Sequence, residues 1–325
     1  MKASVVVPTY GRRAEVTRLL RGLERQTAPM AAFEVIVVVD GSDDGTRELV
    51  ESLSTPYRLV CLWQENRGRA AACNAGISAA AGDVVAILDD DMVPAESWLE
   101  AHLSSHEGTD PVCVVGPVPV TTGDRPSAAT RYIARRFERH LGKLARTGHQ
   151  FAARDFYSGN ASFPLHVLQH LGGFDESFDR YGNEDVELGI RLRRAGVPIV
   201  YCAAAVAFQH QTKGLAELAA DALAKGRTCV HLARLHPDIA PELALSSYRQ
   251  PSRSWRVLRR LLVEALGHST LVRAATIRAA ESADRIGEAR TMELYRLLLD
   301  SCFWVGVREE LRCRGALTGL SLPWP

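Results

Sequence analysis

Short runs of apolar residues alternate with longer segments of helical periodicity along the first hundred residues. The apolar runs predict strands at Ser4–Val7, Val35–Val39, Arg58–Trp63 and Val84–Leu88. The segments between them predict helices at Glu15–Gln26, Thr46–Leu53, Arg69–Ala80 and Pro94–Ser105. This alternation is typical of an α/β fold with a mostly parallel central sheet and helices on both faces.

The pattern is less regular after residue 112. Val112–Val120 predicts one more strand, short or at an edge because two prolines interrupt it. Residues 121–155 form a variable segment that we assign to the acceptor side, and its helix is expected at Ala128–Arg146. The arginines of that helix indicate either a solvated face or recruitment of an anionic or sugar acceptor. Further elements are expected at Glu184–Arg194 (helix), Ile199–Tyr201 and Ala205–Phe208 (strands).

The chain after Gly214 is expected to be helical, which suggests an α/β domain over residues 1–214 and a helical extension over residues 215–325. Within the extension an apolar stripe is formed by Trp255, Leu258, Leu261, Leu262, Ala265 and Leu266. We expect this stripe to pack on the rest of the protein, and a peripheral contact with an anionic membrane face is the alternative. No apolar run approaches the roughly 20 residues of a membrane span.

Charge and cysteine content restrict the partners and the compartment. A net charge of +1 gives no electrostatic case for binding nucleic acid. The seven cysteines include no C-x-x-C pair, which favours a reducing compartment over a zinc cluster or a disulfide framework. A strand begins almost at residue 1, leaving no room for a signal peptide. We therefore expect a cytoplasmic protein, with the inner face of the membrane as the place of any peripheral contact.

Three consecutive carboxylates, Asp89, Asp90 and Asp91, end the apolar run Val84–Leu88. The carboxyl end of a parallel strand is where open α/β sheets bind ligands. Adjacent carboxylates repel one another and call for a cation. Their hard oxygen ligands suit Mg²⁺ or Mn²⁺ that arrives with a phosphate-bearing substrate. The sequence thus predicts metal-assisted chemistry on a nucleotide.

Three other strand ends carry residues that suit a nucleotide. The turn Pro8–Arg12 offers its backbone and Tyr10 to a base, and Arg12 to a phosphate. Asp40 can accept from a base N–H or a ribose hydroxyl. Arg67 and Gly68 precede a helix of small residues that contains Asn74 and can pack closely under a ligand. Each of these features is also compatible with a purely structural role.

The second half of the predicted site follows the glycine pair Gly172-Gly173. Glu184 and Asp185 open a helix, whose dipole favours ionised carboxylates, and an ionised carboxylate beside a bound hydroxyl is what a general base requires. His210 follows a predicted strand and can complete a metal shell.

Several common catalytic motifs are absent from the sequence. There is no G-x-x-x-x-G-K-[ST] loop, and no G-x-G-x-x-G follows the first strand. The histidine pairs His102/His106 and His166/His170 lack the glutamate of H-E-x-x-H, so we expect surface or core roles for them.

Six segments, in order, resemble the family 2 glycosyltransferases of the GT-A fold over about residues 1–214. They are VVVPTYGR, VVVDGSDDGT, NRGRAAACNAG, AILDDDM, GGFDE and GNEDVELGIRLRRAG. Residues 172–196 also look like the C-terminal half of β-1,4-galactosyltransferases and polypeptide N-acetylgalactosaminyltransferases. The resemblance implies a nucleotide-sugar donor, Mn²⁺ or Mg²⁺, and transfer of a hexose to an acceptor hydroxyl with inversion.

The resemblance also implies roles for individual residues. Asp185 would be the catalytic base and Glu184 would contact the acceptor, while Asp91 and His210 would bind the metal. The donor would contact Pro8, Thr9, Tyr10, Arg12, Asp40, Arg67, Gly68, Asn74, Asp89 and Asp90. The chain departs from the family at Val39, where aspartate is frequent, and at Cys73, where arginine is frequent. Arg67 or Arg69 would then supply the missing positive charge.

Other functions remain open at this stage. A sugar-1-phosphate nucleotidyltransferase would need a glycine-rich loop that PTYGRR does not provide, and a processive synthase would need membrane spans. A non-catalytic carbohydrate-binding scaffold on a degenerate transferase fold is a further alternative. The sequence does not identify the acceptor. A sugar, a lipid-linked carrier, a natural product and a protein are all compatible with these residues.

Overall fold

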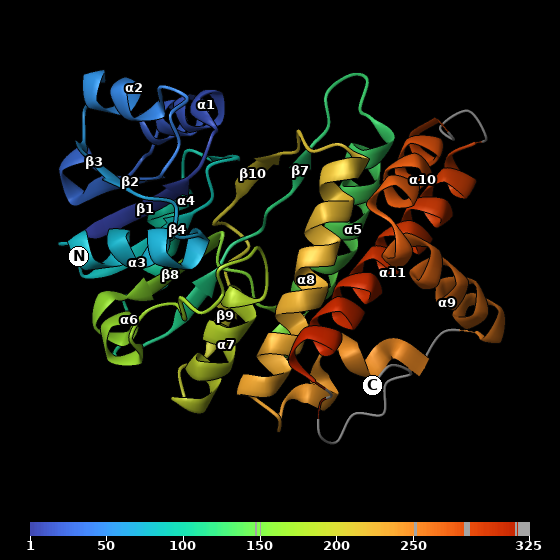
Figure 1. Cartoon of the computed structure of the whole chain (residues 1–325). Coiled ribbons are helices and arrows are strands. Elements are labelled where there is room, and N and C mark those ends of the chain that lie inside the picture. Colours follow the sequence, from blue (N-terminus) through green and yellow to red (C-terminus); the bar gives the residue numbers. More distant parts are fainter. Residues whose placement is uncertain (147, 150, 250–251, 283–286, 316, 318–325) are drawn as a thin grey trace. The chain divides into compact units, whose positions relative to one another are not determined.

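The structure, a computed structural model of the chain, describes residues 1–146, 148–149, 151–249, 252–282, 287–315 and 317 (Figure 1). These residues cluster into two compact units. The first unit comprises residues 1–121, 136–179 and 184–211, and the second comprises 122–135, 180–183 and 212–325. Every residue that the sequence assigns to the site belongs to the first unit.

A seven-stranded sheet with the order β3-β2-β1-β4-β8-β6-β9 forms the centre of the first unit (Figure 1). Strand β8 is antiparallel to both neighbours, and the other pairs are parallel. This arrangement confirms the predicted mixed α/β fold with a mostly parallel sheet. The strands are β1 (Ala3–Thr9), β2 (Phe33–Asp40), β3 (Arg58–Gln64), β4 (Val84–Leu88), β6 (Cys113–Val115), β8 (Asn160–Pro164) and β9 (Ile199–Tyr201).

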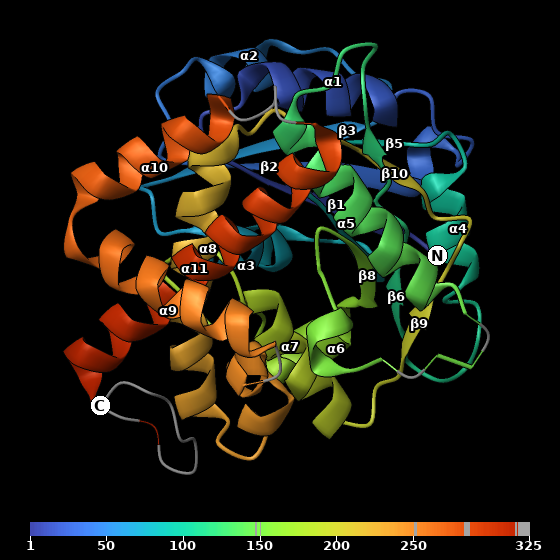
Figure 2. The ribbon, with the colours of Figure 1, turned by 90° about the vertical axis from the view of Figure 1, so that its right-hand side faces the viewer.

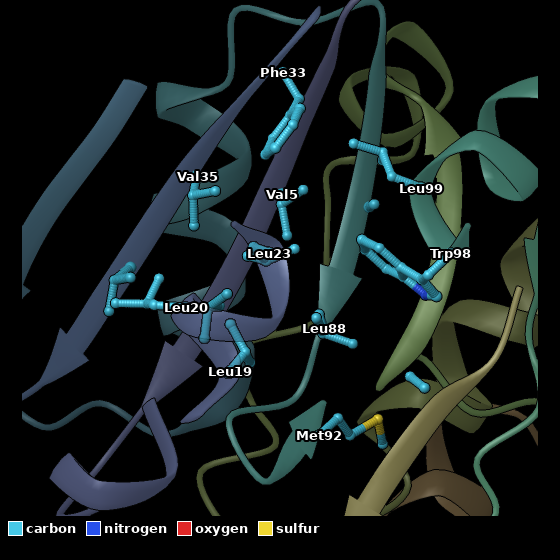
Figure 3. Packing of buried hydrophobic residues seen from close by; sticks show 14 of the residues in the cluster. Val5, Leu19, Leu20, Leu23, Phe33, Val35, Leu88, Met92, Trp98 and Leu99 are labelled. Carbon is cyan, nitrogen blue, oxygen red and sulfur yellow. The ribbon is translucent and has the colours of Figure 1, made fainter. Parts of the chain in front are cut away.

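Helices cover both faces of this sheet because the strand residues are apolar on both sides. Val5 and Val7 point to the face covered by α1 (Arg13–Leu23) and α4 (Trp98–Ser104), where Leu19, Leu20 and Trp98 pack (Figure 3). The short helix α2 (Thr46–Ser52) adds Val50 to the same cluster. Val6 points to the opposite face, which is covered by α3 (Arg69–Ala79), α6 (Leu165–Leu171) and α7 (Glu184–Arg194).

A second sheet of three short strands lies beyond the end of β4. Its order is β5-β10-β7, formed by β5 (Met92–Pro94), β10 (Ala207–His210) and β7 (Val120–Thr121). Strand β10 is antiparallel to β5, with Gln209 opposite Met92. This register places the end of β10 directly beside the acidic residues that follow β4.

The second unit is built mainly from α8 (Leu215–Leu235), α9 (Arg253–His268), α10 (Thr270–Ser282) and α11 (Glu288–Arg314). Figures 1 and 2 show α8 and α11 side by side. A Cβ atom on Gly226 would lie 2.0 Å from the Phe303 carbonyl oxygen, and one on Gly306 would lie 2.0 Å from that of Leu223. The two glycines therefore allow the backbones of these helices to approach closely.

Several predicted boundaries were wrong. The helix expected at Pro94–Ser105 begins at Trp98, because Pro94 pairs in β5. The strand expected at Val112–Val120 is two strands, β6 and β7, separated by the prolines. The strand expected at Ala205–Phe208 is Ala207–His210. Helix α5 (Ala128–Leu144) lies where it was expected, and its residues divide between the two units. The described helices include none that is long and apolar enough to cross a bilayer.

The expectation that the whole apolar stripe of α9 packs inward was also wrong. Leu266 is buried, but Leu258 and Leu261 are 45% and 63% exposed. Arg259 of the same helix is buried instead.

The histidines at the end of α4 have a core role. The two ring nitrogens of His102 lie 2.8 Å from Ser162 Oγ and 3.0 Å from Asn160 Oδ1, and His106 Nε2 lies 2.8 Å from the same Ser162 Oγ. Burial lowers the pKa of both imidazoles to about 4. The structure thus keeps these rings neutral inside the core.

These histidines predict an acid-sensitive stability. A histidine has a pKa near 6.5 in an unfolded chain, so the unfolded state binds protons first as the pH falls. The free energy of unfolding should be undiminished above pH 6.5 and decrease between pH 6.5 and 4, by about 3 kcal/mol for His102. Urea unfolding at several pH values measures this. His102→Gln should reduce the slope of the unfolding free energy against pH by about one proton, whereas His166→Gln, at an exposed position, should leave this slope unchanged. Equal slopes in the parent protein and both variants would contradict the buried, neutral state of His102.

Candidate active site

The acidic residues after β4 lie at the carboxyl end of the central parallel strands. Asp90 is buried and accepts hydrogen bonds from Thr9 Oγ1 and Arg12 Nη1, both at 2.8 Å. Arg12 Nη1 also lies 3.2 Å from Asp91 Oδ2. Burial raises the pKa of Asp90 to about 7, an effect that Arg12 opposes and Asp91 reinforces. The pKa of Asp91 is also raised, by burial and then by Asp89.

Arg69 connects Asp89 to the second half of the site. Its Nη2 lies 2.7 Å from Asp89 Oδ1, and its Nη1 lies 3.0 Å from Ser158 Oγ and 3.5 Å from Glu184 Oε1. Gly159 makes room for this arrangement, since a Cβ there would lie 2.2 Å from Asp89 Oδ2. The tip of β4 and the start of α7 thus share one guanidinium.

Asp185 is the second residue of α7 and is half-buried. One of its oxygens accepts from the backbone N–H of Val186 at 2.8 Å. Glu184, which precedes it, is buried. The N-terminus of α7 favours negative charge on both side chains through the helix dipole.

The predicted nucleotide contacts at the ends of β1 and β2 differ in exposure. Thr9 and Pro8 are buried, whereas Tyr10 is 58% exposed. Asp40 is buried, and its oxygens accept from Gln64 Nε2 at 2.7 Å and from the backbone N–H groups of Arg67 and Gly68, both at 2.9 Å. Asp40 therefore fixes the loop before α3 in the structure.

Asn74 and Arg67 both contact the loop that follows α6. The Asn74 amide accepts from the Phe174 N–H at 2.8 Å and donates to the Phe174 carbonyl and to Glu176 Oε1, both at 2.9 Å. Arg67 Nη2 lies 2.7 Å from Glu176 Oε2 on the surface. Gly173, with φ of 71°, passes so close to Asn74 that a Cβ would lie 2.3 Å from its Oδ1. These contacts hold the 172–176 loop.

His210 and Asp91 are neighbours across the small sheet. The His210 N–H donates to the Asp91 carbonyl at 2.8 Å, and His210 Nδ1 lies 3.2 Å from Thr121 Oγ1. Gln209 Nε2 lies 3.3 Å from Asp91 Oδ2. Burial lowers the pKa of His210, Arg18 lowers it further, and Asp91 opposes both.

These residues fit a divalent ion that is shared with a phosphate. Asp91 Oδ1 is buried and has no hydrogen-bond partner among the described residues, so a carboxylate oxygen is left for a cation. No group of three or more metal-binding side chains is found in the described part of the chain. Mg²⁺ is commonly held by one or two carboxylates with substrate phosphates completing its shell, so this donor set suits that use.

Comparison with solved structures identifies the fold. Mannosyltransferase PcManGT from Pyrobaculum calidifontis, in complex with GDP-Man and Mn²⁺, has a TM-score of 0.61 at 21% identity, covering 94% of this chain and 86% of that one. TarS 1–349 from S. aureus gives a TM-score of 0.53 at 18% identity, covering 93% and 91%. The fold is that of a GT-A glycosyltransferase.

The chain belongs to glycosyl transferase family 2, which matches residues 4–172. Residues 139–212 also match a domain described as the N-terminal domain of galactosyltransferase. Validoxylamine A glucosyltransferase of Streptomyces hygroscopicus subsp. jinggangensis is 28% identical over 99% of this chain and 87% of its own length. The matches confirm the resemblance and identify the protein as a nucleotide-sugar-dependent glycosyltransferase, against the nucleotidyltransferase and scaffold alternatives.

The structure brings together most of the residues predicted from sequence, and it adds Ser158 and Gln209 as partners of Arg69 and Asp91. Asp89, Asp90, Asp91 and His210 lie together, and Arg69 connects Asp89 to Glu184. Asn74 and Arg67 contact the 172–176 loop, so their predicted donor contacts stay predictions. The sequence alone is compatible with either Arg67 or Arg69 supplying charge near Cys73. Arg69 is the one that pairs with Asp89 and with buried Glu184, one helical turn before Cys73.

We predict that the two arginines respond differently to substitution. Arg69→Lys keeps the charge but loses the planar fork that reaches Asp89, Ser158 and Glu184 together, so turnover should fall by at least about tenfold. Arg67→Lys, at an exposed ion pair, should change turnover by less than about twofold. Steady-state kinetics on both variants, with melting curves to confirm folding, measure this. An Arg69→Lys variant that turns over like the parent protein would contradict the organising role of Arg69.

Proposed function

We propose that the protein transfers a hexose from a nucleoside diphosphate sugar to an acceptor hydroxyl, with Mn²⁺ or Mg²⁺ and with inversion at the anomeric carbon. The observation that carries the proposal is the buried oxygen of Asp91, which has no hydrogen-bond partner among the described residues and lies beside His210 at the carboxyl end of β4. Asp91 and His210 would hold the ion. When bound, the ion would neutralise charge that develops on the diphosphate leaving group.

The donor would lie along the carboxyl ends of β1, β2 and β4. Exposed Tyr10 suits stacking with a base, and Asp89, which pairs with Arg69, suits a ribose hydroxyl. Arg12 is already paired with Asp90 and Asp91, and these pairs would adjust when an anionic diphosphate arrives. Pro8, Thr9, Asp40 and Gly68 would shape the base and ribose pocket through the backbone that they position.

Asp185 would act as the general base. Its carboxylate would accept the proton of the acceptor hydroxyl while that oxygen attacks the anomeric carbon from the face opposite the diphosphate. One bond forms, the bond to the diphosphate breaks, and the anomeric configuration inverts. Buried Glu184, held through Arg69, would bind a second acceptor hydroxyl and orient the nucleophile.

Any acceptor must offer a free hydroxyl group to the site. Sugars, natural products, proteins and lipid-linked carriers all offer hydroxyl groups. A lipid-linked acceptor would place the reaction at a membrane surface. The exposed apolar side chains of α9 favour that alternative.

Screening nucleoside diphosphate sugars for thermal stabilisation and hydrolysis tests the proposal. At least one donor should raise the melting temperature and be hydrolysed with Mn²⁺, and both effects should disappear with EDTA. Proton NMR of the transferred sugar should reveal the inverted anomer. Full hydrolysis in EDTA would contradict metal dependence, and a retained anomer would contradict the assigned role of Asp185.

A further inference from the structure

Large apolar side chains point outward from the second unit over a short stretch of α9 and α10. Five large apolar residues between 257 and 272 are 44–79% exposed. We name those on α9, together with exposed Ala265, the α9 outer face. Its members are Val257, Leu258, Leu261 and Ala265. A cluster of this kind marks an interaction surface more often than scattered exposed leucines do.

The members of this face form one stripe. At about 100° per residue, Val257, Leu261, Ala265 and Leu258 fall within a sector of roughly 100°. Arginines lie along one edge of the stripe. They are Arg253, Arg256 and Arg260, and Arg253 and Arg260 are exposed. The face combines apolar surface with a positively charged border.

Buried Arg259 fixes the direction in which this face points. It is 1% exposed, and its guanidinium lies 4.3 Å from the Tyr248 ring centroid and 5.1 Å from that of Trp304. Its Nη1 lies 3.3 Å from Asp300 Oδ2. Val263 and Leu266 are buried on the same side of α9. Because an arginine with these partners occupies the inner side, the apolar stripe is held outward.

We infer that the α9 outer face binds the surface of a bilayer that contains anionic phospholipids. Apolar side chains on one face of a helix enter the boundary between headgroups and acyl chains, and arginines at the border meet the phosphates. Each such charge strengthens binding to an anionic surface. The acidic residue within α9, Glu264, is 2.8 Å from Arg308, so the border keeps its positive character.

Cosedimentation of the full chain with lipid vesicles tests this inference. The protein should sediment with vesicles of phosphatidylcholine and phosphatidylglycerol. Leu258→Glu/Leu261→Glu should weaken that binding by at least about tenfold, because two apolar groups are replaced by anions that the surface repels. Leu235→Glu is the matched control, since Leu235 is 42% exposed at the end of α8, and it should bind like the parent protein.

The contribution of the arginines at the border of the stripe can be measured separately. Arg253→Gln/Arg260→Gln should weaken binding to the anionic vesicles by about tenfold, and added salt should weaken the parent protein similarly. Donor hydrolysis without vesicles should be unchanged in every variant, so a failure here is distinguishable from a failure of the proposed function.

Three results would overturn the inference. The first is that the parent protein stays in the supernatant, and the second is that the Leu258→Glu/Leu261→Glu variant sediments with vesicles like the parent. The third is that sedimentation velocity shows the parent to be an oligomer and this variant a monomer, with unchanged vesicle binding. The last result would assign the face to contact between copies of the chain.

Discussion

Asp185→Asn is expected to lower turnover by at least about a thousandfold while leaving donor affinity within about threefold. The substitution is nearly isosteric and removes the carboxylate that would take the acceptor proton. Asp185 opens α7, whereas Asp91 follows β4, so the donor site should persist. Steady-state kinetics with saturating donor, and calorimetric donor titration with Mn²⁺, measure the two quantities separately.

The matched control removes an acid from the first turn of another helix in the same unit. Glu48, exposed in α2, also experiences the positive end of a helix dipole. Glu48→Gln should therefore reproduce any general electrostatic effect and leave turnover unchanged. A variant Asp185→Asn that retains turnover within tenfold of the parent enzyme would refute the base assignment.

Asp91→Ala should weaken donor binding in Mn²⁺ by at least about a hundredfold and have little effect on whatever binding persists in EDTA. The reason is that Asp91 supplies the carboxylate oxygen left without a hydrogen-bond partner among the described residues. Asp91→Asn, which preserves shape and the contact with Gln209, should behave in the same way. Calorimetric titration of the donor with and without Mn²⁺ gives both affinities.

Asp43, an exposed acid in the loop after β2, provides the control for Asp91. Asp43→Ala should retain the metal-dependent gain in donor affinity, and melting curves on all variants should confirm that they fold. If Asp91→Ala binds the donor as tightly as the parent protein in Mn²⁺, the metal lies elsewhere.

The central strands were predictable because parallel strands buried on both faces are continuous apolar runs, as in Val35–Val39. Strand β8 was not predicted as a strand. Its Asn160 and Ser162 are polar, and their burial depends on His102 and His106 from a distant segment. Local sequence does not encode such partners.

The site was predictable to the extent that strand ends meet at one edge of a sheet. That rule places Asp89–Asp91 with the ends of β1 and β2, and the register of β10 then brings His210 to Asp91. This rule does not reveal which arginine pairs with which carboxylate. The choice of Arg69 for Asp89, and of Asn74 for the 172–176 loop, depends on packing between helices far apart in sequence.

The outward direction of the α9 stripe shows the same limit. Periodicity reveals that Leu258 and Leu261 share a face, but it does not reveal which face meets the core. In the structure, the packing of Arg259 against Tyr248 and Trp304 decides which face of α9 meets the core.

The most direct test of the metal site is an anomalous difference map from crystals grown with Mn²⁺ and the nucleoside diphosphate of the best donor. We expect a manganese peak in contact with an Asp91 carboxylate oxygen and with a diphosphate oxygen. A bound nucleotide with manganese away from Asp91, or with none at all, would contradict it.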